Sequence, residues 1–113
     1  MGRFLDSAEF ANAHGTLTAD KLKRLPGLMI VRGRFSDAIV ISTRSLATVG
    51  RCGAAVWIDG INLGTGYNVN QLHPNEIAAV EWYAGTATIP VQFSGLPRRG
   101  QPPVCGVLVI WLR

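Results

Sequence analysis

The residues best suited to acid–base chemistry in this 113-residue chain are two carboxylates and two histidines. Asp59 and Glu81 fall in segments predicted to be strands, and a sheet that brought them together would place two carboxylates for proton transfer. His14 and His73 stand far apart in the sequence. The structural alternative is that Asp59 holds its own turn, Glu81 faces water or an arginine, and His73 is a polar loop residue. The sequence favours this alternative, so we predict no catalytic residue.

Motifs for metals, phosphates and activated nucleophiles are also missing. The spacing of Cys52, Cys105, His14 and His73 is not that of a zinc site. The glycines that follow Asp59 do not open a helix, as a phosphate-binding loop would require. We therefore expect no metal site, no cofactor and no enzymatic activity. The alternative is a small α+β enzyme, or a subunit of one, whose site follows none of these motifs.

Each of the two cysteines, Cys52 and Cys105, stands directly before a glycine and a segment predicted to be a central strand. If the two strands are neighbours, their starts lie within reach of a disulfide bond, which would close a loop of about 54 residues and stabilise the fold by ~4 kcal/mol. A disulfide bond would indicate an oxidising compartment. The alternative is a pair of buried free thiols. We expect the disulfide bond.

The composition is typical of one folded domain. Apolar residues make up 48% of the chain and charged residues 16%, which argues against disorder. The net charge of +4 comes from scattered basic residues without interleaved aromatic residues, so we expect no nucleic-acid partner. The longest apolar run, 107–112, is too short for a membrane-spanning helix. Because the chain has few charged residues to cover its surface, some of its apolar surface is available for contact with a partner or with another copy of the chain.

The periods of the apolar residues predict an α+β domain in two layers, a mixed sheet of four or five strands with short helices on it. Two helices are expected near the N-terminus. One covers 8–14, and the next begins at a cap formed by Thr16 or Thr18. In the second helix, Leu17 would face the core and Lys21 would face water.

The strand pattern is clearer towards the C-terminus. A turn at Asp59-Gly60 is expected to end one strand, and a single helical turn from Pro74 is expected to place Ile77 and Val80 on one side. The segments predicted to be strands are 28–31 and 39–43 as a hairpin, then 54–58, 80–84 and 106–113.

Aromatic residues are concentrated in these strands, namely Trp57, Trp82, Tyr83 and Trp111. They predict either packing within the fold, which we favour, or a platform that stacks on a carbohydrate or another ligand. Two loops, 64–71 and 94–103, are candidates for contact with a ligand or partner. Their polar and basic residues are Asn68, Asn70, Gln71, Arg98 and Arg99.

Four segments in this order resemble the plug domain of TonB-dependent outer-membrane receptors. They are 22–28 (LKRLPGL), 56–60 (VWIDG), 74–85 (PNEIAAVEWYAG) and 106–111 (GVLVIW). The chain is most similar to a sub-type with one cysteine before the Asp-Gly strand and another before the last strand. That sub-type often occurs without a barrel, behind a carboxypeptidase-regulatory-like domain.

The resemblance implies a single plug-like domain over 1–113, part of a longer exported protein of the periplasm or outer membrane. The first residues lack the apolar core of a signal peptide, so we expect the export signal to lie outside this chain. The implied function is that of a non-enzymatic binding or interaction domain, with a link to outer-membrane substrate uptake. The implied partner is a β-barrel or another envelope protein. The sequence contains no barrel and no visible TonB-contact segment, so transport and energy coupling are not carried over.

Overall fold

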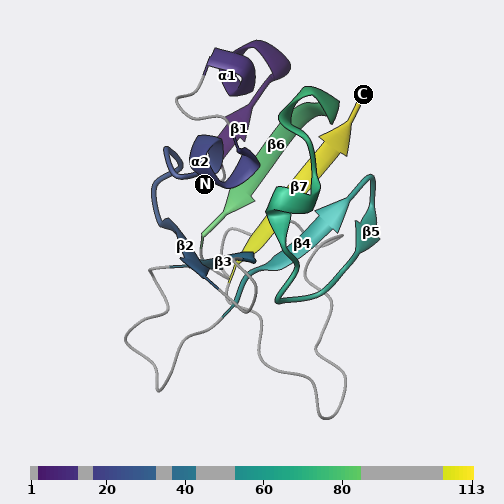
Figure 1. The fold of residues 1–113 in the computed structure, drawn as a ribbon. Coiled ribbons are helices and arrows are strands. Elements are labelled where there is room, and N and C mark those ends of the chain that lie inside the picture. The colour runs from purple at the N-terminus through teal and green to yellow at the C-terminus, as the bar shows by residue number, and fades with distance from the viewer. Residues whose placement is uncertain (1–2, 13–16, 33–36, 43–52, 85–105) are drawn as a thin grey trace.

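The computed structural model describes residues 3–12, 17–32, 37–42, 53–84 and 106–113 (Figure 1). Its larger sheet has five strands in the order β1-β6-β7-β4-β5. Their bounds are Arg3–Leu5 for β1, Ala55–Ile58 for β4, Ile61–Asn62 for β5, Ile77–Tyr83 for β6 and Val107–Leu112 for β7. The smaller sheet is a hairpin of β2 (Leu28–Arg32) and β3 (Ala38–Ser42).

Within the described residues, short helical segments accompany the strands: α1 (Ser7–Asn12), α2 (Thr18–Leu22), and the 3-10 helices η3 (Val69–Gln71) and η4 (Pro74–Glu76). The predicted α+β architecture with a mixed sheet is confirmed. The arrangement of the strands differs from the prediction in two ways. The hairpin forms a sheet of its own, and the short edge strand β1 was not expected.

β7 is the central strand of the larger sheet, as the apolar run at the end of the chain predicted. It pairs antiparallel with β6 and parallel with β4. Its first four residues, 107–110, are buried. The parallel pair places Ala55 opposite Val107, and the amide of Ala55 donates to the carbonyl of Gly106 at 3.0 Å. A strand with neighbours on both sides has to be apolar on both faces, which explains its composition.

β6 is irregular near its start. Its register with β7 shifts between Ile77 and Ala79, so one residue of β6 is extra, as in a β-bulge. In a regular strand Ile77 and Val80 would face opposite sides, yet both are buried in the same core. The sequence predicted a helical turn for this pair, but the turn ends at Glu76, and the shift in register is what brings both side chains inward.

Gly106 begins β7 where three segments meet. Its φ of +117° lies in a region that favours glycine, and an added Cβ would lie 3.0 Å from the carbonyl oxygen of Tyr83. Ser42 of β3 reaches the same junction, where its hydroxyl donates to the carbonyl of Ala84 at 2.5 Å. This junction therefore joins the hairpin to the larger sheet through close backbone contact.

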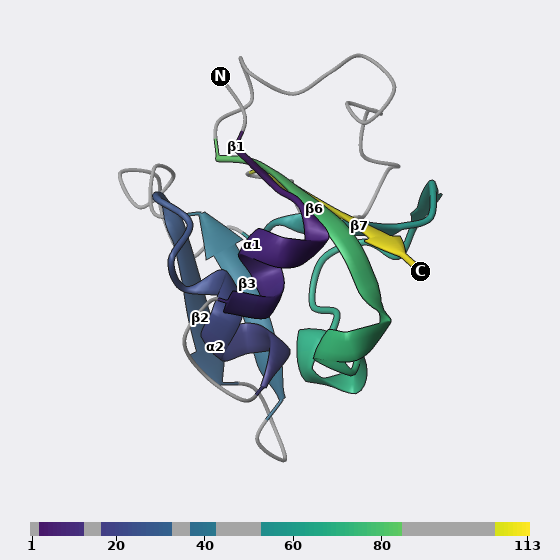
Figure 2. The same cartoon turned by 90° about the horizontal axis from the view of Figure 1, so that it is seen from above.

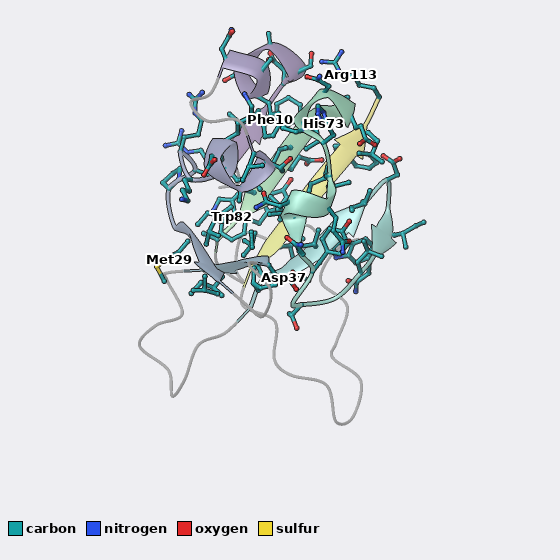
Figure 3. The ribbon with its side chains drawn as sticks, in the orientation of Figure 1. Phe10, Met29, Asp37, His73, Trp82 and Arg113 are labelled. Atoms are coloured by element: carbon teal, nitrogen blue, oxygen red, sulfur yellow. The ribbon has the colours of Figure 1, made fainter. Side chains whose placement is uncertain are left out.

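The helices and the β2–β3 hairpin cover one side of the larger sheet, which we call the inner face (Figure 2). Phe10 of α1 and Trp82 of β6 are each 1% exposed and belong to this core (Figure 3). The indole N–H of Trp82 donates to the carbonyl of Pro26 at 2.9 Å, which satisfies its one polar atom. The core is thus built from segments far apart in sequence.

The predicted cap of α2 is wrong. The first helical residue is Thr18, and its hydroxyl donates to the carbonyl of Leu72 at 2.6 Å instead of capping the helix. The amide of Ala19 donates to the side-chain oxygen of Asn70 at 2.9 Å. Asn70 therefore caps α2 from outside, a role that no local pattern in the sequence indicates.

The predicted orientation of α2 is wrong at two further positions. Leu17 is 51% exposed instead of facing the core. Lys21 is 8% exposed instead of facing water, and its ammonium group donates to the carbonyl of Ala11 at 3.0 Å. The ammonium also lies 5.8 Å from the centre of the Phe10 ring. A cation that binds the last carbonyls of a helix is favoured by the helix dipole, which explains why this lysine turns inward.

Candidate functional site

The candidate site lies on the side of the larger sheet away from the helices, which we call the outer face. Side chains alternate along strands, so β6 presents Glu81 and Tyr83 there, β7 presents Trp111, and β4 presents Trp57. The three aromatic residues are partly buried and pack on a small apolar cluster of Ala55, Val107 and Val109. Trp82 instead points to the inner core, so the aromatic residues that the sequence grouped together divide between the two faces.

Glu81 lies among the aromatic side chains of the outer face. Its Oε1 accepts a hydrogen bond from the hydroxyl of Tyr83 at 2.6 Å. Its Oε2 accepts one from the indole N–H of Trp111 at 2.5 Å. The carboxylate is therefore fixed by two ring donors from neighbouring strands.

Phe4 completes this arrangement. It lies directly opposite Glu81 in the pairing of β1 with β6, so the two side chains share the outer face. Phe4 is 58% exposed, although a large apolar side chain on a strand usually packs. We call Phe4, Trp57, Glu81, Tyr83 and Trp111 the aromatic face. Sequence reasoning missed Phe4 because a strand of three residues gives too short a pattern to detect.

The electrostatics of the aromatic face centre on Glu81. The ion pair found among the described residues joins Lys23 and Asp20 at 3.6 Å. Within that part of the chain, the partners of the Glu81 carboxylate are therefore the neutral donors Tyr83 and Trp111. Burial, the hydrogen bond to Glu81 and the negative charge of Glu81, in decreasing order of effect, together raise the pKa of Tyr83 from 10.0 to about 12. The tyrosine is thus held as a neutral donor.

The two carboxylates considered for acid–base chemistry have separate partners. Asp59 occupies the β4–β5 turn with a φ of +50°, and its Oδ1 accepts from the amide of Leu112 at 2.8 Å. Glu81 binds the two ring donors described above. His73 caps η4, because its Nδ1 accepts from the amide of Asn75 at 3.3 Å. These contacts give Asp59 and His73 structural roles, and His14 lies outside the described residues.

The polar residues of the first candidate loop turn partly inward. Asn68 accepts from the amide of Ala38 at 3.0 Å and donates to Asp37 at 3.2 Å. Asn70 caps α2, as described above. Gln71 is exposed. Asn68 and Asn70 therefore tie η3 to β3 and α2, whereas Gln71 faces solvent.

Four of the residues singled out from the sequence, Cys52, Arg98, Arg99 and Cys105, lie outside the described residues. Among the residues that are described, no group of three histidine, cysteine, aspartate or glutamate side chains is arranged to hold a metal ion. Within the same segments, no helix has the length and apolar character needed to cross a membrane.

No protein-family model matches the sequence, and no curated protein matches it.

Proposed function

We propose that this chain is a non-enzymatic, plug-like binding domain of the bacterial cell envelope, and that the aromatic face is its binding surface. The observation that carries the proposal is the set of rings around Glu81. Phe4 is largely exposed, and Tyr83 and Trp111 are fixed beside it through one carboxylate. Exposed aromatic side chains held by a rigid sheet are typical of surfaces that bind a partner.

The plug-like part of the proposal has support in where the four resembling segments fall. Segment 22–28 covers the end of α2 and the start of β2, and 56–60 covers β4 and its turn. The described part of 74–85 forms η4 and β6, and 106–111 forms most of β7. Strands β6, β7 and β4 are consecutive neighbours in the sheet. The segments of the resemblance thus supply its centre.

The proposed location is the periplasm or the outer membrane, and the proposed partner is a β-barrel or another envelope protein. The parallel pairing of β4 with β7 supports the disulfide bond between Cys52 and Cys105, since each cysteine shortly precedes one of these strands. A disulfide bond belongs to an oxidising compartment. A link to substrate uptake at the outer membrane follows from the resemblance alone.

Site-specific photo-cross-linking in the cell tests this function. A photoreactive phenylalanine analogue replaces Phe4 in the native gene product, and the same analogue replaces Leu17 as the control. Both side chains are exposed, at 58% and 51%, but Leu17 directly precedes α2, which lies on the covered side of the sheet. We expect Phe4 to capture an envelope protein that Leu17 does not capture. Equal capture at both positions, or capture of cytosolic proteins alone, would overturn the proposal.

A further inference from the structure

We propose that the aromatic face binds a peptide segment of a protein partner through one lysine or arginine side chain, with the cation placed against Glu81. This inference rests on the proposed binding function and names the chemistry of the partner. The proposed ligand is a short peptide segment with a basic residue and apolar residues, and not a carbohydrate or a small ion.

The carboxylate of Glu81 has neutral partners and room for a further one. Each carboxylate oxygen accepts one hydrogen bond from a neutral ring donor, Tyr83 or Trp111. Both donors are uncharged groups, so neither supplies a positive charge that would offset the carboxylate. A carboxylate offers about four lone-pair positions, so these two hydrogen bonds leave capacity for a further donor. Among the described residues, no basic side chain forms an ion pair with it.

Aromatic side chains surround the carboxylate of Glu81. The aromatic residues nearest to Glu81 in the sheet are Phe4 across β1, Tyr83 along β6 and Trp111 on β7. The face of an aromatic ring attracts ammonium and guanidinium groups, because the ring carries negative charge density above its plane. A cation beside Glu81 is therefore attracted both by the negative charge of the carboxylate and by the faces of the surrounding rings. An anionic or purely polar ligand would gain from neither.

The aromatic face is larger than a small ion. The aromatic face extends from β1 to β4, which are three strand spacings apart in the sheet. At about 4.8 Å per spacing this distance is roughly 14 Å, more than a small alkylammonium ion covers. Phe4 lies at one end and Trp57 towards the other, with the carboxylate between them. A peptide with one basic residue between apolar residues matches this order.

Peptide titration of the whole chain tests the inference. The probes are acetyl-Leu-Lys-Leu-amide, the same peptide with norleucine in place of lysine, and n-butylammonium. Binding is followed by the NMR signals of the tryptophan indole N–H groups, one of which, that of Trp111, contacts Glu81. We expect the lysine peptide to bind about fivefold more tightly than the norleucine peptide, as an ion pair and a ring contact of ordinary strength would give.

Variants assign this preference to the aromatic face. Glu81→Gln should make the affinities for the two peptides equal, whereas the control Glu9→Gln, at an exposed helix position, should leave the preference unchanged. Phe4→Ala should weaken binding of both peptides, and since Phe4 is 58% exposed, the substitution removes little of the packing that holds the fold. Leu17→Ala is the matched control for this loss of exposed apolar surface.

Three results would overturn the inference: equal binding of both peptides by the native chain, a lysine preference that survives Glu81→Gln, or binding of n-butylammonium as tight as that of the lysine peptide. The cross-linking experiment at Phe4 is independent of these results. An envelope partner captured at Phe4 together with no lysine preference would retain the binding function and reject the cationic segment.

Discussion

At the scale of single residues, Glu81 and Tyr83 are coupled through both a hydrogen bond and charge. The pKa of Tyr83 in the folded chain is about 12, against an ordinary value of 10.0. As the pH rises, the hydroxyl of Tyr83 therefore loses its proton at a lower pH in the unfolded chain than in the folded chain. The stability that the neutral hydroxyl contributes is complete below pH 10 and is lost as the pH rises from 10 to about 12.

Replacement of Glu81 by glutamine tests this coupling. The glutamine removes the negative charge, so we expect the pKa of Tyr83 to fall from about 12 towards 10.0, while burial, the largest cause, keeps it above the ordinary value. Tyrosinate absorbance measures the change, and a Tyr67→Phe background leaves Tyr83 as the one tyrosine that titrates. An unchanged pKa in Glu81→Gln would contradict the proposed coupling, and Glu9→Gln serves as the charge control.

Lys21 is a second residue whose environment sets its role. Lys21→Met keeps the apolar stem but removes the donor to the carbonyls of Phe10 and Ala11. We expect the free energy of unfolding to fall by about 1–2 kcal/mol, because the end of α1 loses a charged hydrogen-bond partner. Urea unfolding measures this loss. Lys23→Met, at an exposed ion pair, should change stability by less than about 0.5 kcal/mol, and equal effects of the two substitutions would contradict the assigned role.

At the scale of elements, the start of β7 is the point where steric constraint is greatest. Gly106 and Gly66 both have positive φ, at +117° and +85°, but only at Gly106 would an added Cβ meet other atoms within 4 Å. Gly66→Ala should therefore cost about 1 kcal/mol through the backbone alone. Gly106→Ala should cost about 1–3 kcal/mol more through contact with the Tyr83 carbonyl. Thermal unfolding compares the two, and equal costs would contradict close packing at this junction.

The elements also show what the sequence could and could not predict. The apolar run 107–112 and the Asp59-Gly60 pair gave a central strand and a hairpin turn, because burial on both faces and positive φ leave local signals. The cap of α2 left no such signal, because Asn70 stands 51 residues from Ala19 in the chain. The contacts of the candidate site also left no local signal in the sequence. The period of two predicted the strands, but the bond between Glu81 and Trp111 depends on register, which alternation does not fix.

At the scale of the whole molecule, the larger sheet has two unlike faces. The inner face joins the helices and the hairpin in one core that includes Trp82 and Phe10. The outer face carries a smaller apolar cluster beneath Trp57, Tyr83 and Trp111. The inner face therefore holds most of the buried side chains that stabilise the fold, and the outer face is the one that we propose binds a partner.

The proposed disulfide bond belongs to this scale because it would link two segments far apart in the chain. We expect intact mass after alkylation to show Cys52 and Cys105 linked in protein exported to an oxidising compartment, and free only after reduction. The bond would raise the free energy of unfolding by ~4 kcal/mol in the chain-entropy model, which unfolding with and without reductant measures. The double variant with serine at both positions is the control. Two free thiols in the exported protein would reject the bond and remove one argument for the compartment.

The order of the strands also determines how the fold would respond to mechanical force. β1 and β7 are each antiparallel to β6, so they run in the same direction on either side of it. Tension between Arg3 and Arg113 would therefore act parallel to the strands. It would shear the hydrogen bonds between β1 and β6 and between β6 and β7, so that all the bonds of a strand pair bear the force at once. β1 pairs over three residues, whereas β7 pairs along most of β6. The edge strand should consequently detach first, while the central strands that carry Glu81, Tyr83 and Trp111 remain paired.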